Sequence, residues 1–414
     1  MSTTFIWIIS LLTIALIIIR PFRLSEAIWA TAGAALLLIT GLLSPAEGWS
    51  GIVKGLDVYL FLTGMMLLAE TARQAKLFDW LAAHATRLSK GSTIRLFILI
   101  YLVGTIVTIF LSNDATAVVL TPAVAYAVRS AKVKNPLPYL LICAFIANAA
   151  SFVLPISNPA NLVIYGEHMP PLFEWLPRYL LPSLVSIVCT GLLLLLTQRK
   201  QLNEVIDTEI EIPALGHGGR VALAGIGLTA VVLLTASALD WDLGWPTAIT
   251  GVLITLIVTV SARLRVSTIV KHVSWAVMPL VGGLFVIVEG LNKTGITQKL
   301  TDLLNQASDA SAAKTAWASS AVVGVGCNVI NNLPAGLIAG NVLQESHVPE
   351  IVKSSVLIAV DLGPNLSVTG SLATILWLVA LRREGLDVSA WAFLKLGLLI
   401  MTVTLAFTIA SLFI

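Results

Sequence analysis

The sequence predicts an all-α integral membrane protein built from two inverted repeats, and three observations lead to this prediction. Of the 414 residues, 57% are hydrophobic and only 11% are charged, with a mean hydropathy of +0.93. A soluble domain has about a quarter of its residues charged, so much of this surface must face lipid. Apolar segments of about 17 to 25 residues, long enough to cross a hydrocarbon core, recur along the chain. The third observation is an internal repeat of polar motifs.

The first half is expected to hold five membrane-spanning helices and one hairpin. The spans are predicted at 3–20, 25–43, 54–74, 136–168 and 174–198. The run at 3–20 has no positive residues before its apolar stretch and no small-residue cleavage site, which favours a spanning helix over a signal peptide. The segment 93–131 has two apolar arms around Ser112-Asn113-Asp114, and such polarity is costly in lipid. It is therefore expected to be a re-entrant hairpin whose tip lines a protein-walled cavity.

A polar stretch, 199–219, is the one predicted linker and is expected to be cytoplasmic. After it, the second half repeats the same order of elements. Spans are predicted at 220–239, 245–261, 274–292, 351–382 and 389–412, with a hairpin at 311–346 around Asn331-Asn332-Leu333-Pro334. The helices 136–168 and 351–382 are both expected to be discontinuous. Each repeat, 1–198 and 220–414, thus has five transmembrane helices, one of them discontinuous, plus one re-entrant hairpin.

The two halves align by sequence at a nearly constant offset. An offset of 219 residues pairs Gly64 with Gly283, Glu70 with Glu289 and Asn113 with Asn332. Further along the chain the offset shrinks to 213 and pairs Asn148 with Asp361 and Asn158 with Ser371. Because each half crosses the membrane an odd number of times, the second copy is inverted, as in many secondary transporters.

The distribution of Lys and Arg predicts the orientation, because cytoplasmic loops carry an excess of these residues. In this topology one side receives 19 of the 25 Lys and Arg residues. The other side receives only Lys54, Arg178, Lys293, Lys299, Lys314 and Lys353. The rich side is expected to be cytoplasmic, so both termini would be periplasmic in a bacterial-type inner membrane. The net charge of +3 reflects this sorting, and no nucleic-acid partner is expected.

The predicted helix breaks are the expected solute site. Pro155 and Pro159 interrupt the first helix, and 361–371 interrupts the second. Broken helices expose unpaired N–H and C=O groups, which suit a small polyhydroxylated or anionic solute. The candidate substrate-binding residues are Asn113, Asn158, Asn161, Asn332, Ser371 and Thr374. The alternative for such side chains is ordinary helix–helix contact, worth about 1 kcal/mol or less.

Two acidic residues are the candidate proton carriers. Asp114 lies at the first hairpin tip and Asp361 lies in the second discontinuous helix, with no Lys or Arg close in sequence. A carboxyl group removed from water binds a proton more readily, which suits proton coupling. The alternative is that each only holds the local backbone. Glu70 and Glu289 lie towards helix ends and are interpreted as orienting the connecting helices.

Several other function classes lack their motifs. The sequence has neither the G-x-x-x-x-G-K-[ST] motif nor H-E-x-x-H, so neither ATP hydrolysis nor a membrane metalloenzyme is expected. Cys143, Cys189 and Cys327 lie in separate apolar runs without C-x-x-C spacing and are interpreted as core residues. The chain is therefore expected to be a transporter, with no enzymatic activity, resident metal or cofactor.

These motifs resemble the arsenite/antimonite permease (ArsB) family of the ion transporter superfamily, over nearly the whole chain. The matching segments are Asn113-Asp114 with Leu120-Thr121-Pro122, Ser157-Asn158 with Asn161, Asn331-Asn332-Leu333-Pro334, and Asp361-Leu362-Gly363-Pro364 with Gly370-Ser371-Leu372-Ala373-Thr374-Ile375-Leu376-Trp377. The last is the most specific because of its length. The resemblance implies export of arsenite or antimonite, as neutral As(OH)3, coupled to proton entry. Some members also associate with a separate soluble ATPase.

One departure from the family pattern concerns Asn148, where members often carry Asp. The first repeat thus lacks a carboxylate that the second keeps at Asp361, which puts shared proton coupling between the halves in question. Two alternative functions stay open. One is a sodium- or proton-coupled transporter of another small anion. The other is the passive membrane subunit of an ATP-driven arsenite pump.

Overall fold

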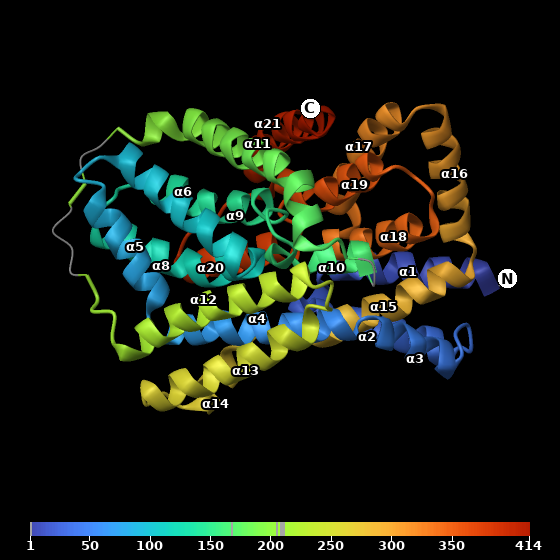
Figure 1. The fold of residues 1–414 in the computed structure, drawn as a ribbon, viewed down its shortest axis with the longest axis horizontal. Coiled ribbons are helices and arrows are strands. Elements are labelled where there is room, and N and C mark those ends of the chain that lie inside the picture. Colours follow the sequence, from blue (N-terminus) through green and yellow to red (C-terminus); the bar gives the residue numbers. More distant parts are fainter. Residues whose placement is uncertain (1, 167–168, 204–205, 208–211) are drawn as a thin grey trace.

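The computed structural model describes residues 2–166, 169–203, 206–207 and 212–414, and these contain helices but no strand (Figure 1). The predicted linker therefore lies partly outside the described residues, as does the end of the predicted helix 136–168. The helices of the first half are α1 (Ser2–Ile19), α2 (Glu26–Ile39), α3 (Pro45–Lys54), α4 (Leu56–Gln74), α5 (Leu77–Leu88), α6 (Thr93–Phe110), α7 (Asn113–Ala115), α8 (Thr121–Ser130), α9 (Leu137–Ala149), α10 (Pro159–Tyr165) and α11 (Leu172–Gln198).

The second half follows the same order of elements. Its helices are α12 (His217–Ala238), α13 (Gly244–Ser261), α14 (Val266–His272), α15 (Val277–Lys293), α16 (Ile296–Ala310), α17 (Ala312–Ile330), α18 (Asn332–Glu345), α19 (Glu350–Leu362), α20 (Leu372–Arg383) and α21 (Ala390–Ala410). Helix α12 begins at His217, three residues before the predicted start of this span at 220.

Five helices of the described chain are long and apolar enough to cross a membrane. They are Thr93–Phe110, Leu172–Gln201, His217–Ala238, Gly244–Ser261 and Ala390–Phe413. Two bent pairs, α3 with α4 at 47° and α14 with α15 at 41°, would raise the number to seven if each pair crosses as one span. The helices α1, α2 and α9 are apolar but shorter. The sequence did not predict α3, because its ten residues are not strongly hydrophobic, begin with Pro45 and are followed by Gly55.

The helices of one half pack against helices of the other half in a reciprocal way. Helix α4 packs on α13, and α15 packs on α2. A Cβ atom added at Gly64 would lie 2.1 Å from Thr247 O, and one added at Gly283 would lie 2.7 Å from Ala30 O. These two glycines are related by the 219-residue offset, and each lets two helix backbones touch. Figure 1 shows these four helices along one side of the molecule, with α11 and α21 along the other.

The segment from the start of α6 to the end of α8 begins and ends at the same face of the protein. The Thr93 hydroxyl, at the start of α6, donates to Leu202 O in the linker. After α8, Ala131 O accepts a 3.0 Å bond from Asp207 N, also in the linker. Both ends of this segment therefore lie against the same stretch of chain, and its middle points into the protein.

Helices α9 and α19 form the centre of the fold. From Pro138 to Ala149, every residue of α9 is buried, and α19 is almost as fully enclosed up to Leu362. A helix that is apolar on all sides is stable only when other helices surround it. The breaks that follow these two helices are therefore placed in the middle of the protein.

Candidate solute-binding site

A small cavity lies where the two chain reversals meet the two helix breaks. Its water-accessible volume is about 40 Å³, and one water needs roughly 10–15 Å³ of such volume. Residues from α7, α10, α18 and α20 form its polar wall, while α4 and α15 close it with apolar side chains. Five predicted site residues line it: Asn113, Asp114, Asn158, Asn332 and Ser371. We call this space the central cavity.

The first break is held open by asparagine side chains. The chain leaves α9 at Ala149 and becomes extended at Asn158 (φ −150°, ψ 131°), which caps α10 by accepting a 3.0 Å bond from Ala160 N. Asn161 Nδ2 donates to Ser151 O at 3.0 Å and lies near two further carbonyl groups. Asn161 therefore faces the backbone of the break and does not line the central cavity.

The second break is built in the same way with hydroxyl groups. Ser371 caps α20 by accepting a 3.1 Å bond from Thr374 N, and the two hydroxyls lie 2.8 Å apart. Asn332 N, at the start of α18, donates to Gly370 O at 2.8 Å. The second reversal is thereby attached to the second break. Thr374 is buried behind Ser371 and does not line the cavity.

The turn residues before α7 and α18 occupy equivalent positions. Ser112 and Asn331 both have positive φ, 154° and 72°, and their sequence numbers differ by the offset of 219. Each caps the helix that follows, because Ser112 Oγ accepts from Ala115 N and Asn331 Oδ1 accepts from Leu333 N. The strained φ of Asn331 places Asn332 at the cavity wall. Asn331 also lines the cavity, a role that the sequence analysis did not assign.

Several hydrogen bonds cross between the halves at the breaks, and two of them occupy equivalent positions. Asn158 Nδ2 donates to Asp361 Oδ1 at 2.7 Å, and Ser371 Oγ donates to Asn148 Oδ1 at 3.3 Å. The offset of 213 pairs Asn158 with Ser371 and Asp361 with Asn148. The capping residue of each break therefore binds the residue at the end of the other half's central helix.

Asp361 has an incomplete set of partners. Its side chain is fully buried, and no Lys or Arg of the described residues forms an ion pair with it. Among the described residues, no group donates a hydrogen bond to its Oδ2. The Ser151 hydroxyl lies nearby but donates to Asn148 O at 2.8 Å instead. Burying an unpaired charge is costly, so this position suits a carboxyl group that gains and loses a proton.

Asp114 lies between the central cavity and a second cavity of about 50 Å³. The second cavity extends between α4 and α14 and is lined by Glu70 and His272 as well as Asp114. The Asp114 carboxylate makes no hydrogen bond or ion pair with the described residues. A solute or proton that moved between the two cavities would therefore pass this carboxylate.

Glu70 and Glu289 each bind a basic residue. Glu70 receives bonds of 2.6 and 2.7 Å from Arg73 and one of 2.7 Å from Gln74. Glu289 accepts a 2.7 Å bond from Lys54. Glu70 thus connects neighbouring turns at the end of α4, whereas Glu289 connects α15 to α3.

One cavity residue was missed entirely by the sequence analysis. Glu26, in the first turn of α2, lines the central cavity and forms an ion pair with Arg20. No motif in the sequence marks Glu26, because only the packing of the helices brings it to the cavity. The described residues contain no group of three or more His, Cys, Asp or Glu side chains arranged to hold a metal ion.

The fold and this site together define a multi-pass membrane transporter, in which helix breaks from both halves meet at a small central cavity. Residues 14–360 match the family described as citrate transporter (CitMHS). The chain belongs to this family.

The sequence is also similar to named transport proteins along nearly its whole length. It is 27% identical to the arsenical pump membrane protein of Escherichia coli K12 over 432 residues, covering 98% of this chain and 97% of that protein. The protein of the same name from Yersinia enterocolitica is 25% identical over 419 residues, with the same coverage. The predicted resemblance to the arsenite/antimonite permease family is thus confirmed.

A solved structure supports the fold. The YdaH transporter of Alcanivorax borkumensis superposes with a TM-score of 0.57 over 88% of this chain and 86% of that chain, at 13% identity. At this identity the likeness concerns the fold alone.

Proposed function

We propose that this chain is a secondary active transporter that exports arsenite, and antimonite, from the cytoplasm in exchange for protons. The observation that supports this most is the central cavity, where amides and a hydroxyl from both halves form part of the wall beside Asp114, and where Asp361 binds the wall residue Asn158. The similarity to arsenical pump membrane proteins supports the cargo.

The chemistry of the cavity wall favours a neutral triol. As(OH)3 both donates and accepts hydrogen bonds, and amide side chains offer both kinds of partner. Asn113, Asn158 and Asn332 supply amides, and Ser371 supplies a hydroxyl. The volume of about 40 Å³ leaves room for a few atoms and no more. Asn161 and Thr374 do not contact the solute in this proposal. They stabilise the two breaks, Asn161 through its bond to Ser151 O and Thr374 through its bond to Ser371.

Proton exchange acts through the bond between Asn158 and Asp361. A hydrogen bond to an ionised carboxylate is roughly twice as strong as one between neutral groups. When Asp361 is charged it holds the Asn158 amide at 2.7 Å, and when it is protonated it releases that amide to the solute. Asp114 relays protons between the central cavity and the second cavity. Proton binding and solute binding are thereby linked.

We further propose that the chain is made of two inverted repeats, 1–198 and 220–414, each with five spans and a re-entrant hairpin. The reciprocal contacts of Gly64 and Gly283 support this. The crossed bonds of Asn158 and Ser371 support it as well. The halves would move against each other and expose the central cavity to either side in turn. In an inner membrane, both termini would be periplasmic.

The first test is arsenite flux in everted membrane vesicles or proteoliposomes with an imposed pH gradient and no ATP. Accumulation that collapses when an uncoupler is added is the expected result. Citrate and a C4 dicarboxylate serve as alternative solutes in the same vesicles. Vesicles without the protein give the background. Absence of proton-driven arsenite flux from vesicles that contain folded protein would exclude the proposed export.

A sodium- or proton-coupled carrier of another small anion is the second candidate. The description of its family as citrate transporters favours it. A further observation is Arg20, which is paired with Glu26 at the cavity wall and brings a cation closer to the site than the sequence suggested. Because Glu26 already neutralises Arg20, a dianion gains less there than at a free cation. Saturable citrate uptake that requires sodium or protons would establish this function instead.

The third function, a passive subunit of an ATP-driven pump, differs in its energy source. It predicts that arsenite flux appears only when a soluble ATPase and ATP are supplied. The ATP-free vesicle experiment separates this function from proton exchange, because a passive subunit cannot accumulate arsenite against its gradient.

A further inference from the structure

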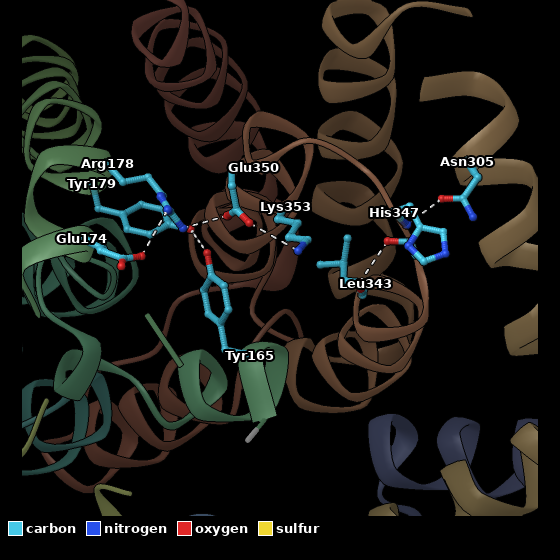
Figure 2. A network of polar contacts seen from close by, with 10 residues as sticks. Tyr165, Glu174, Arg178, Tyr179, Asn305, Leu343, His347, Glu350 and Lys353 are labelled. Carbon is cyan, nitrogen blue, oxygen red and sulfur yellow. Dashed lines mark hydrogen bonds and ion pairs between the residues drawn. The ribbon is translucent and has the colours of Figure 1, made fainter. Parts of the chain in front are cut away.

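A network of charged and phenolic side chains connects α10, α11 and α19 (Figure 2). Arg178 on α11 binds Glu350 on α19 at 2.7 Å and lies 3.9 Å from Glu174. Its guanidinium also lies beside the Tyr165 hydroxyl at the end of α10. Tyr165 and Tyr179 share a 2.6 Å hydrogen bond. Arg178 therefore contacts groups from both halves of the chain.

This network borders a third cavity, which is larger than the other two. Its volume is about 360 Å³. The charged residues that line it are Glu174, Arg178, Asp240, Glu350 and Lys353. We call it the outer cavity.

The outer cavity and the second cavity lie at opposite ends of α12. The start of α12 lies near the second cavity. Gly219 there approaches the carbonyl oxygen of Ala75, the residue after α4, and Glu70 near the end of α4 lines that cavity. Two residues after the end of α12, Asp240 lines the outer cavity. The 22 residues of α12 span about 33 Å at 1.5 Å per residue. The hydrocarbon core of a bilayer is about 30 Å thick, so α12 is long enough to place the two cavities towards opposite sides of a membrane.

Helices α10 and α19 are tied together at both ends. At the inner end, Asn158 on α10 binds Asp361 on α19. At the outer end, Tyr165 on α10 and Glu350 on α19 both contact Arg178. Asn158 faces the central cavity and Tyr165 faces the outer cavity. The short helix α10 is therefore the wall between the two spaces, and Arg178 fixes its outer end.

We propose that the outer cavity is the exit vestibule of the solute path and that Arg178 is the residue that closes it from the central cavity. This inference rests on the proposed transport function. Loss of the contact between Arg178 and Glu350 would release α10 from α19 and open the path outward. The vestibule would then receive the solute from the central cavity.

The charges of the vestibule define the solute that it takes. Among the described residues that line the vestibule, three carboxylates (Glu174, Asp240 and Glu350) face two cations, Arg178 and Lys353. Both cations are already paired with Glu350. An anion would therefore be repelled by the remaining carboxylates. An uncharged polyhydroxylated solute can accept bonds from the cations and donate to the carboxylates. The vestibule thus suits a small neutral polyol-like solute.

The proposal is tested by thiol labelling from one side, which needs no solute and does not depend on the identity of the cargo. Cys143, Cys189 and Cys327 are first replaced by alanine, and a reporter, Ala373→Cys, is placed on the central cavity wall. A membrane-impermeant maleimide is added to intact cells, and labelling is normalised to the protein present in the membrane. Arg178→Gln is expected to speed external labelling on the order of tenfold, within the range of measured conformational couplings.

Three controls make the result specific. Arg178→Lys keeps the charge and should label as slowly as the parent protein. Arg382→Gln removes an exposed ion pair with Asp387 elsewhere and should change nothing. Asp240→Cys, in the outer cavity, should be labelled from outside in every background. A second reporter, Leu284→Cys, is placed on the same cavity wall. If both reporters are labelled at the same rate in the parent protein and in Arg178→Gln, Arg178 does not close the vestibule. Labelling of Asp240→Cys only from the cytoplasmic side would overturn the vestibule.

Discussion

Asn158 and Asp361 are 203 residues apart in sequence and are joined by a 2.7 Å hydrogen bond at the centre of the protein. One residue caps the helix after the first break, and the other ends the helix before the second break. The bond therefore connects the two halves at the place where each half loses regular structure. We therefore expect a change of charge on Asp361 to act on the helix break of the other half through this bond.

The first prediction concerns Asp361. In Asp361→Asn, arsenite flux should no longer depend on the imposed pH gradient, because the buried group that exchanges a proton is gone. The measurement is the initial rate in everted vesicles with and without an uncoupler. Asp309→Asn, an exposed acid on α16, is the matched control and should keep the dependence. Flux by Asp361→Asn that still collapses with the uncoupler would refute the assignment.

The second prediction concerns Asp114, the carboxylate shared by the central and second cavities. Asp114→Asn should lower proton-driven arsenite flux on the order of tenfold or more, within the range for loss of a proton-transfer group. Glu289→Gln loses a carboxylate that is paired with Lys54 outside both cavities, so its flux should match the parent protein. Equal fluxes in the two variants would show that Asp114 only supports the turn before α8.

Much of this arrangement could be predicted from the sequence because its signals are local. Apolar length indicates helices, and proline pairs such as Pro155 and Pro159 break them. The polar motifs at Asn113 and Asn332, each between two apolar segments, indicated where α7 and α18 begin. The offsets of 219 and 213 paired the residues that later proved to make equivalent contacts.

Other features depend on which helices meet, and no local pattern reports that. Asn161 and Thr374 belong to the same motifs as Asn158 and Ser371, but helical spacing turns Asn161 to the backbone of its break and the Thr374 hydroxyl to Ser371. Glu26 reaches the central cavity only because α2 packs on α15. The outer network escaped notice because Arg178 and Glu350 lie 172 residues apart.

The third prediction concerns the close contact between α4 and α13. Gly64→Ala should destabilise the protein by about 1–3 kcal/mol, the range measured for overpacked cores, because the new Cβ would meet the Thr247 carbonyl. Gly227→Ala is the matched control, since nothing lies within 4 Å of its added Cβ. That change should be neutral or stabilising, because alanine favours a helix more than glycine does. Thermal unfolding of both purified variants in detergent is the measurement, and equal stability would contradict the contact.

The fourth prediction moves the carboxyl group to its equivalent place in the other half. Asn148 is held by Ser371, its Oδ1 accepting at 3.3 Å, just as Asp361 is held by Asn158. The double variant Asp361→Asn with Asn148→Asp should therefore regain part of the pH-gradient dependence that Asp361→Asn loses. The rescue will be partial, because aspartate cannot donate to Asn365 Oδ1 as the Asn148 amide does at 3.0 Å.

The matched control for this rescue is Asp361→Asn with Asn365→Asp, which adds a carboxyl group to the same buried cluster. Asn365 is not paired with Asp361 by the 213-residue offset, and its amide donates to Phe145 O at 3.0 Å. This control should stay insensitive to the pH gradient. Rescue by Asn148→Asp but not by Asn365→Asp means that a carboxyl group at either crossing bond can exchange the coupled proton. The coupling then belongs to the symmetric pair of breaks. Rescue by both variants would mean that any buried acid suffices, and rescue by neither would confine coupling to the geometry around Asp361.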